Sequence, residues 1–418
     1  MKTNFFTRMA LMACASVLVL SCSDDAAEVD ALDLQETNLE TEKAIVYTHG
    51  SYELEGEYIV VFDRQMTGDV TAKAGGNYDA AKAAVRELAT EVIGGVAKNG
   101  LTINHVFSKT MQGVSLSLTP DQVTALSSDK RIAYIEKDQM FTLAPPPGKG
   151  PNGGGGDGGG SPAQETPWGI TRVNGGATYT GSGVAWIIDS GIDAAHPDLN
   201  VDVSRGFNAF TKGKDSDLSK DGDGHGTHVA GTVAAIDNNI GVVGVAAGAT
   251  VIPVKVLDSR GSGSYSGVIA GVDHVAANGS NGDVANMSLG GGFSQAVNDA
   301  VVAAAATGVK FALAAGNEST NAATKSPASA NGNNVYTISA MSQGDNWASF
   351  SNFGNPPVDF CEPGVAIKST WTGGGYNTIS GTSMASPHAA GLLLLGNIGN
   401  GGTVNGDPDG NADTIGVN

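Results

Sequence analysis

One serine in the C-terminal half of the chain has surroundings that suit a nucleophile. Ser383 lies in the stretch Gly-Thr-Ser-Met-Ala-Ser-Pro-His (residues 381–388), where a glycine-containing loop is expected to lead into an apolar helix over residues 389–395. A helix N-terminus offers unpaired backbone N–H groups and the positive end of the helix dipole, which an acyl-transfer site needs beside its nucleophile. A serine alone is a poor nucleophile, so this interpretation requires a base and an acid upstream.

Both groups are present. Asp189 ends an apolar run typical of a buried strand, and His225 opens the segment His-Gly-Thr-His-Val-Ala-Gly-Thr, typical of an apolar helix start. The chain order is therefore Asp189, His225, Ser383, which is the subtilisin order and differs from that of two unrelated folds with these residue types. No Gly-x-Ser-x-Gly motif surrounds Ser383, which argues against an α/β-hydrolase.

Five motifs in this order resemble the subtilisin (S8) family of serine peptidases with an inhibitor I9-type propeptide. They are Asp-Ser-Gly-Ile, Asp-Gly-His-Gly-Thr-His-Val-Ala-Gly-Thr, Asn-Met-Ser-Leu-Gly-Gly, Ala-Ala-Gly-Asn and Gly-Thr-Ser-Met-Ala-Ser-Pro-His. The resemblance covers roughly residues 55–395 and implies an α/β fold. That fold is a subtilisin-like three-layer αβα arrangement with a mostly parallel sheet, preceded by a small α+β ferredoxin-like propeptide domain.

The resemblance implies a role for four residues in peptide hydrolysis through an acyl-enzyme. Ser383 would attack the scissile carbonyl, His225 would take the proton and pass it to the leaving amine, and Asp189 would hold the imidazole tautomer. Asn317, in Ala-Ala-Gly-Asn, would stabilise the oxyanion together with the Ser383 backbone N–H, although by itself it also fits a turn after glycine. His228 is expected to pack within its helix rather than react.

By resemblance, two extended segments would bind the substrate backbone by strand addition, and Tyr265 would floor an outer subsite. Glycines permit the close approach of another backbone. Residues 317–329 supply no obvious buried acid, so we expect broad specificity with an apolar or aromatic P1 residue, which is the residue before the scissile bond. The residues of the two segments are Gly261, Ser262, Gly263, Ser288, Leu289 and Gly290.

Structural calcium is the cofactor that the resemblance implies, with no organic cofactor. Residues 236–242 resemble the family's tight calcium loop, and oxygen ligands suit this hard cation; an Asn-rich turn is the alternative. A weaker site, similar to that of proteinase K, would use Asp359 with the carbonyls of Asn333 and Val335. The first site would use the side chains of Gln164, Asp198 and Asn238 and the carbonyls of Ile236, Ile240 and Val242.

Residues 55–143 are expected to form a βαββαβ unit, as in ferredoxin-like domains, and an unrelated ferredoxin-like module is the alternative. Its strands are predicted at 58–62, 101–108, 113–118 and 132–136, with helices at 79–93 and 120–127. From residue 163 to 418, apolar runs at 183–189, 251–256, 283–289 and 309–315 alternate with helical stretches at 225–235, 266–277 and 295–307. This alternation predicts a parallel sheet covered on both faces.

The N-terminus predicts export. Residues 9–20 form an apolar run after Lys2 and Arg8, too short to span a bilayer and typical of a signal peptide over 1–22. Val-Leu-Ser-Cys at 19–22 resembles a lipobox, which makes Cys22 the candidate lipidation site; an ordinary signal peptide is the alternative. Residues 23–54 are predicted to form an acidic tether, which begins with Ser-Asp-Asp at 23–25, similar to the surface-export signals of some Gram-negative lipoproteins. Residues 144–162 are predicted to form a Gly/Pro-rich linker.

Composition limits the partners. The net charge of −19 over 418 residues disfavours nucleic acid and an anionic membrane surface. We expect an exported monomer that acts on polypeptides, with its own propeptide as inhibitor and a lipid anchor as its sole membrane contact. It would be a bacterial outer-membrane or cell-surface lipoprotein, or secreted after propeptide removal. Cys361 is predicted to be a buried, inert thiol.

Residues 407–413, Asp-Pro-Asp-Gly-Asn-Ala-Asp, resemble part of a calcium loop without its terminal glutamate, so a solvated acidic tail is expected there. Two other functions stay open beside a general zymogen endopeptidase. One is a catalytically inactive binding module on the same fold, and the other is a dedicated processing peptidase for one partner protein.

Overall fold

The computed structural model describes residues 43–49, 52–97, 100–143 and 162–418. The predicted signal peptide, Cys22, most of the predicted tether and residues 144–161 of the linker lie outside this description. Residues 42–418 form one compact unit. Within it we distinguish an N-terminal part (residues 43–143) and a C-terminal part (residues 162–418).

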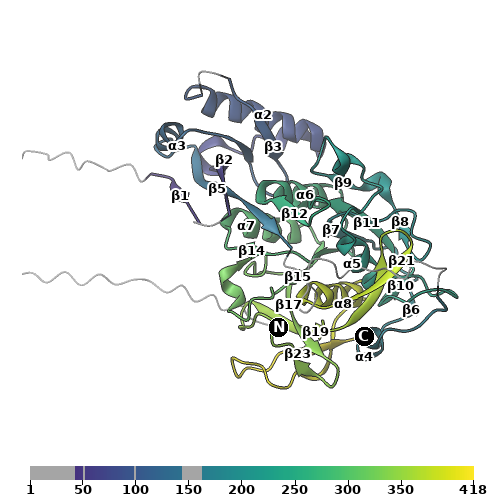
Figure 1. Cartoon of the computed structure of the whole chain (residues 1–418). Helices are drawn as coiled ribbons and strands as arrows, with labels where there is room; N and C mark the ends of the chain where they lie inside the picture. The colour runs from purple at the N-terminus through teal and green to yellow at the C-terminus, as the bar shows by residue number, and fades with distance from the viewer. Residues whose placement is uncertain (1–42, 50–51, 98–99, 144–161) are drawn as a thin grey trace, which may run out of the picture. The chain divides into compact units, whose positions relative to one another are not determined.

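The N-terminal part is a sheet of order β1-β5-β2-β4-β3 with helices on one face (Figure 1). Apolar side chains of α2 and α3 pack on this face around Val60, Val114 and Ile135, and the predicted βαββαβ order is confirmed. Pro120 lies in the first turn of α3, as predicted, where its missing N–H costs nothing. The elements are β1 (Ile45–Tyr47), β2 (Glu53–Phe62), α1 (Arg64–Thr67), α2 (Tyr78–Gly94), β3 (Ile103–Phe107), β4 (Gly113–Ser117), α3 (Pro120–Leu126) and β5 (Ile132–Thr142).

The N-terminal part begins earlier than the sequence predicts. The predicted tether extends to residue 54, whereas β1 and the first residues of β2 lie within that range. β1 pairs in parallel with β5, and Tyr47 lies opposite Glu136. The apolar sequence Ile-Val-Tyr adds a strand to an open sheet edge, which a polar tether does not do.

The C-terminal part is built on a mostly parallel sheet of order β22-β23-β19-β17-β15-β13-β7-β11-β8. Successive side chains of β7 enter opposite cores, with Trp186 and Ile188 on one face and Ala185 and Ile187 on the other. Its main strands are β7 (Ala185–Asp189), β8 (Asn200–Val201), β11 (Thr250–Lys255), β13 (Val284–Met287), β15 (Lys310–Ala314), β17 (Val335–Ser342), β19 (Val358–Pro363), β22 (Gly399–Thr403) and β23 (Thr414–Val417).

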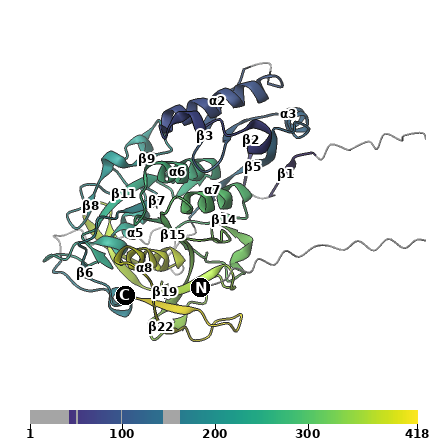
Figure 2. The same ribbon diagram turned by 180° about the vertical axis from the view of Figure 1, so that it is seen from behind.

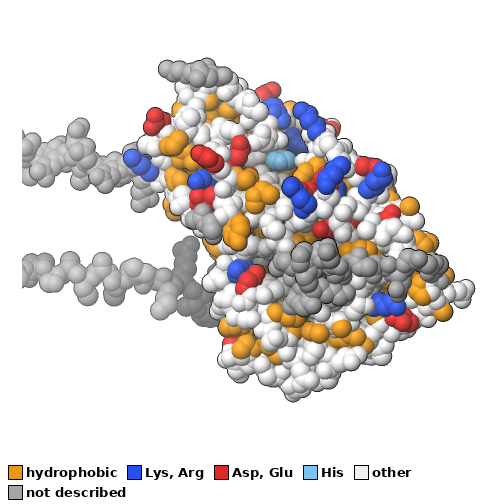
Figure 3. Space-filling model, in the orientation of Figure 1, with side chains coloured by type: hydrophobic (Ala, Val, Ile, Leu, Met, Phe, Trp, Pro, Cys, Tyr) orange, Lys and Arg blue, Asp and Glu red, His pale blue; other side chains and the backbone are white. Residues whose placement is uncertain are grey.

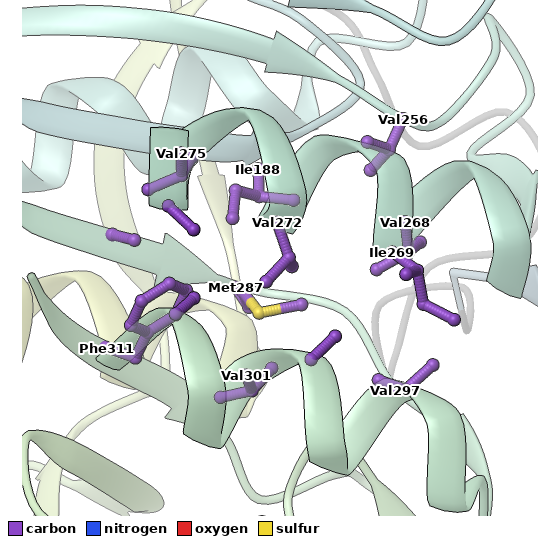
Figure 4. Packing of buried hydrophobic residues seen from close by; sticks show 14 of the residues in the cluster. Ile188, Val256, Val268, Ile269, Val272, Val275, Met287, Val297, Val301 and Phe311 are labelled. Atoms are coloured by element: carbon purple, nitrogen blue, oxygen red, sulfur yellow. The ribbon is translucent and has the colours of Figure 1, made fainter. Parts of the chain in front are cut away.

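Helices cover both faces of this sheet, as predicted. α6 (Tyr265–Asn278) and α7 (Gln295–Ala305) pack on one face, where Val272, Val301 and Phe311 meet Met287 (Figure 4). α5 (His225–Ala234) and α8 (Thr382–Leu395) pack on the other face. The layered αβα fold is thereby confirmed. The remaining elements are α4 (Trp168–Arg172), β6 (Ala177–Thr178), β9 (Phe207–Asn208), β10 (Ala246–Ala247), β12 (Ser262–Ser264), β14 (Gly291–Gly292), β16 (Lys325–Ser326), β18 (Asn346–Trp347), β20 (Ile367–Trp371) and β21 (Gly375–Ile379).

The two parts share a core and a strand pair. Ile59, Val61 and Phe107, on the sheet face away from α2, join the cluster that contains α6 and α7. The end of β5 pairs antiparallel with β12, with Phe141 opposite Gly263. Figures 1 and 2 show β5 extending from its own sheet toward α6 and α7.

The C-terminal segment is more ordered than the sequence predicts. β22 and β23 form a hairpin, and β23 pairs in parallel with β19 at Cys361 and Ile415. Cys361 is fully buried, as predicted. The expectation of a solvated acidic tail is wrong for Asp413, which is 2% exposed and accepts hydrogen bonds from Ser339 and from Asn355 Nδ2.

Charged side chains of both signs occur on the face of the molecule that Figure 3 shows, interspersed among uncharged ones. Among the residues that the structure describes, no helix is long and apolar enough to span a membrane.

Candidate active site

Asp189 and His225 meet where β7 ends and α5 begins. His225 Nδ1 lies 2.9 and 3.0 Å from the two carboxylate oxygens of Asp189, which is fully buried. Parallel strands bring their carboxyl ends to one sheet edge, so the last residue of β7 faces the start of a covering helix. Because Nδ1 faces the carboxylate, Nε2 is the ring nitrogen turned away from it.

The charge environment of His225 favours its imidazolium form. Burial by itself disfavours that form, but the carboxylates of Asp189, Asp223 and Asp221 outweigh it, so the pKa of His225 is raised above its usual value. An imidazole held next to carboxylates in this way suits a general base that must accept a proton during a reaction.

Asp221 and Ser190 fix the helix that carries His225, and the sequence reasoning missed both. Asp221 accepts the Ser190 hydroxyl (2.9 Å) and the Thr227 N–H (2.9 Å). Ser190 Oγ in turn accepts the Gly226 N–H at 2.9 Å. These acceptors satisfy first-turn N–H groups that have no partner inside a helix. An aspartate four residues before a predicted helix start was the available signal.

Ser383 lies in the first turn of α8, which begins at Thr382 rather than at the predicted residue 389. Its hydroxyl donates to the Ser288 carbonyl at 3.1 Å, and the Ser288 hydroxyl donates to the Ser383 carbonyl at 2.7 Å. Pro387 has no N–H to offer that carbonyl across the helix turn, which leaves it available to Ser288. Among the described residues, no hydrogen bond joins Ser383 to His225.

Asn317 is oriented by the same turn. Its side-chain oxygen accepts the Thr382 backbone N–H at 2.8 Å and the Thr382 hydroxyl at 3.0 Å. Two donors on one atom identify that atom as the oxygen and leave Nδ2 on the opposite side of the amide. In the described part of the chain, neither Nδ2 nor the Ser383 N–H has a hydrogen-bond acceptor, so both are available as donors.

A strand of the N-terminal part occupies the first predicted substrate segment. Residues 140–142 pair antiparallel with Ser262–Ser264, and the Leu143 N–H donates to the Gly261 carbonyl at 2.9 Å. Gly261 has a φ of +68°, which favours glycine, and a Cβ atom there would come within 3.0 Å of the Leu143 side chain.

Tyr265, the residue predicted to floor an outer subsite, lies beside this strand. Its ring stacks on Phe141 with centroids 4.0 Å apart, and its hydroxyl donates to the Gly292 carbonyl at 2.9 Å. Phe141 also lies next to Gly291, just past the second predicted segment of Ser288, Leu289 and Gly290. Phe141, at the end of β5, therefore lies against both Tyr265 and Gly291, while its strand pairs with the first of these segments.

The predicted calcium residues also converge. Asn238 Nδ2 donates to Asp198 Oδ1 at 2.8 Å, and the Asn238 N–H donates to Gln164 Oε1 at 2.5 Å. The Ile236 N–H donates to the Asp198 carbonyl, and the Val242 N–H to Asp198 Oδ2. Burial raises the pKa of Asp198, which a cation would offset. Side-chain and carbonyl oxygens of this kind are the ligand type that calcium takes.

The second predicted cation site is less complete. Asp359 accepts the Thr337 N–H at 2.9 Å, and burial raises its pKa. Val335 begins the neighbouring strand β17, which places its carbonyl near this position in the sheet. The described residues contain no group of three His, Cys, Asp and Glu side chains that could hold a metal, and both predicted sites depend mainly on amide and carbonyl oxygens.

His228 packs as predicted and does not join the site. It is fully buried, its Nε2 lies 3.0 Å from the Ile367 carbonyl, and burial lowers its pKa to about 3. A histidine that stays neutral in a helix interior contributes packing and a backbone contact rather than acid–base chemistry.

Two family models match the chain. The subtilase family model matches residues 182–396, and the peptidase inhibitor I9 model matches residues 57–144. The first match spans the Asp189, His225 and Ser383 region, and the second spans most of the N-terminal part.

Two sequence relatives agree with these matches. Alkaline serine exoprotease A of Vibrio alginolyticus is 42% identical over 71% of this chain, which spans 53% of that protein. Subtilisin NAT of Bacillus subtilis subsp. natto is 37% identical, over 83% of this chain and 81% of that protein. The crystal structure of a cold adapted subtilisin-like serine proteinase is 43% identical, with a TM-score of 0.49, over 55% of this chain and 83% of that one.

Proposed function

This chain belongs to the subtilase family as a subtilisin-like serine protease with an I9 propeptide, and we propose that it hydrolyses peptide bonds through Ser383, His225 and Asp189. The observation that carries this assignment is the contact of His225 Nδ1 with both Asp189 oxygens, at 2.9 and 3.0 Å. It supports an imidazole of fixed tautomer whose Nε2 is directed to a substrate.

The proposed reaction has two halves. The Ser383 hydroxyl turns from the Ser288 carbonyl to His225 Nε2, which takes its proton as Oγ bonds to the scissile carbon. His225 then delivers this proton to the amine as the C–N bond breaks, leaving an acyl-enzyme. Water repeats the sequence, giving its proton to His225 and releasing the carboxylic acid and Ser383. Asp189 stabilises the imidazolium in both halves.

Asn317 Nδ2 and the Ser383 N–H are proposed to bind the oxyanion. Support comes from their lack of other acceptors among the described residues and from the hold of Thr382 on the Asn317 oxygen. Donors fixed before the reaction need no reorganisation when charge develops, which makes them effective in a site shielded from water.

The substrate is proposed to enter as a strand between residues 261–263 and 288–290. The pairing of residues 140–143 with this groove supports both that mode and an inhibitory role for the propeptide, which would block the groove until it is removed. We propose broad specificity with an apolar P1 residue, and an aromatic preference where Phe141 stacks on Tyr265.

Calcium is proposed at the loop over 236–242, held by Gln164, Asp198 and Asn238 with the carbonyls of Ile236, Ile240 and Val242. When bound, it would tie the start of the C-terminal part to this loop. A weaker site at Asp359 is proposed with the carbonyls of Asn333 and Val335. Neither cation would take part in the chemical steps.

Export through a signal peptide over 1–22, with lipidation at Cys22, is also proposed. It would be followed by a tether to about residue 42, a propeptide to residue 143, a linker over 144–162 and a monomeric catalytic domain over 163–418. The apolar run and the lipobox-like Val-Leu-Ser-Cys support this scheme.

The test is casein hydrolysis by the purified full chain beside Ser383→Ala, with calcium and with chelator, followed by N-terminal sequencing of the products. We expect hydrolysis and a shortened chain only with Ser383 intact. Equal chain lengths and no hydrolysis in both would contradict the proposal and favour a binding module. Cleavage of a few selected sequences but not casein would indicate a dedicated processing peptidase.

A further inference from the structure

Residues 43–49, ahead of the I9 match, belong to the folded N-terminal part. The match begins at residue 57, whereas residues 43–49 already contain β1, paired in parallel with β5. The Ala44 N–H also donates to the Ser127 carbonyl at 2.7 Å. Figures 1 and 2 show β1 at the edge of the sheet beside β5. We call residues 43–49 the strap.

The strap lies against the two residues through which β5 holds α7. The Tyr134 hydroxyl donates to Asp299 Oδ2 at 2.8 Å, and Glu136 Oε2 accepts the Ala296 N–H at 2.9 Å. Ala296 is in the first turn of α7, where N–H groups lack helical acceptors and a negative charge is favourable. The strand pairing places Ile45 opposite Tyr134 and Tyr47 opposite Glu136.

The second carboxylate oxygen of Glu136, Oε1, has an ionisable neighbour in the strap. Its side chain is fully buried, and among the described residues nothing donates a hydrogen bond to Oε1. His49 Nε2 lies 3.3 Å from Oε1 without hydrogen-bond geometry, so the contact is an ion pair when the imidazole is protonated. A buried carboxylate without a compensating charge is costly, and breaking such a pair by removing one partner is strongly destabilising.

The position of His49 is itself fixed. Its backbone N–H donates to Glu53 Oε1 at 2.5 Å, and Glu53 Oε2 pairs with Lys137 Nζ at 2.8 Å. The Tyr47 ring makes an edge contact with Tyr134, with centroids 5.6 Å apart. His49 and Tyr47 of the strap therefore contact Glu136 and Tyr134, the two β5 side chains that bind α7.

We propose that the strap is an inhibitory device, in which His49 and Tyr47 act through Glu136 and Tyr134 to hold the propeptide on the first turn of α7. His49 is a positioning residue and touches neither substrate nor the reacting atoms. The inhibitory consequence rests on the proposed role of the propeptide. Loss of the strap loosens this contact and shortens the latent period of the zymogen.

Amide hydrogen exchange in the full chain with Ser383→Ala tests the contact without any need for activity. His49→Leu is expected to speed exchange at Ala296 about tenfold, as for loss of a charge-supported hydrogen bond. The matched control is Ser266 in the first turn of α6, whose N–H donates to Asp138 rather than to Glu136, at 3.1 Å. Its exchange stays unchanged, and His49→Lys restores protection at Ala296.

Unchanged exchange at Ala296, or an equal rise at Ser266, overturns the proposal. If His49→Leu does not fold, Tyr47→Ala replaces it, and exchange at Ala296 and Ser266 is measured and interpreted in the same way. In the chain with Ser383 intact, His49→Leu shortens the lag before casein hydrolysis, and an unchanged lag would show that the strap does not inhibit. If no chain hydrolyses casein, the proposed function fails while the exchange result still decides whether the strap holds α7.

Discussion

Ser288 and Ser383 are joined by two reciprocal hydrogen bonds. The Ser383 hydroxyl donates to the Ser288 carbonyl at 3.1 Å, and the Ser288 hydroxyl donates back to the Ser383 carbonyl at 2.7 Å. One segment after β13 and the first turn of α8 therefore fix each other, with Pro387 keeping the Ser383 carbonyl out of the helix ladder.

Ser288→Ala should lower kcat/KM about three- to tenfold, because the Ser383 carbonyl loses its donor and a net hydrogen bond is worth about 0.5–1.5 kcal/mol. The measurement is hydrolysis of a chromogenic peptide with an apolar P1 residue. Ser319→Ala, whose hydroxyl bonds to the Ser349 carbonyl at an exposed position, is the matched control. Equal kinetics for both variants would contradict this role of Ser288.

Asn317→Ala should lower kcat about 10²–10³-fold with little change in KM, since the oxyanion exists only along the reaction path; this magnitude was itself obtained for a subtilisin asparagine. Steady-state kinetics on the same peptide measure it. Asn321→Ala, at a nearby exposed cap, should keep its kcat. A rise in KM at constant kcat would instead indicate that Asn317 binds substrate.

Asp223→Asn should shift the acid limb of the kcat/KM profile to lower pH. The Asp223 carboxylate helps to raise the pKa of His225, and hydrolysis needs the neutral imidazole. Removing that negative charge lowers the pKa of His225, so activity persists at a pH where the wild type is protonated. Asp217→Asn, which removes an exposed carboxylate paired with Lys220, should leave the limb in place.

Chelation of calcium should lower the melting temperature of the Ser383→Ala chain by about 5–10 °C. A cation at a hundred times its Kd stabilises by about 2.7 kcal/mol, and each kcal/mol shifts the midpoint of a domain of this size by about 2–4 °C. Asp198→Asn should melt lower in calcium and respond little to chelator. Calorimetry that finds the same chelator response in both chains would exclude Asp198 as a ligand.

The local contact between Asp138 and the first turn of α6 should weaken as pH rises through about 6. Burial raises the pKa of Asp138 from 3.8 to about 6 despite its bonds from Ser266, so the attached state binds a proton more tightly. The contribution of protonated Asp138 to the stability of the attached state is complete below pH 3.8 and is lost as the pH rises past about 6. Exchange at Ser266 in the Ser383→Ala chain, corrected for intrinsic rates, should rise between pH 5 and 7.

The control for Asp138 lies in the same part of the chain. Asp138→Asn should abolish the pH trend because no titratable group remains at this position. Asp129→Asn, at a partly exposed carboxylate paired with Arg131, should preserve it. If the Ser383→Ala chain and its Asp138→Asn and Asp129→Asn variants show the same change in exchange with pH, a group other than Asp138 causes it.

The sequence alone, through local chemistry, supplied the candidate site residues. Asp189, His225, Ser383 and Asn317 lie next to glycines and at the ends of apolar runs, where strand and helix termini expose polar side chains. The alternation of apolar strands and helices likewise predicted the parallel sheet, because the spacing of buried apolar residues can be recognised within each short segment. Their roles in catalysis stay predictions.

Long-range contacts required the tertiary structure. Neither the hold of Asp221 on the α5 turn nor the reciprocal bonds of Ser288 and Ser383 can be read from spacing, since their partners are chosen by how strands and helices meet. The same holds for His49, in a segment predicted to be a tether, and for Asp413, predicted to be solvated. Sequence alone determined which residues carry reactive groups and the class of fold that presents them. Tertiary packing decided which buried charges and backbone groups face each other, because that depends on distances between segments far apart in the chain.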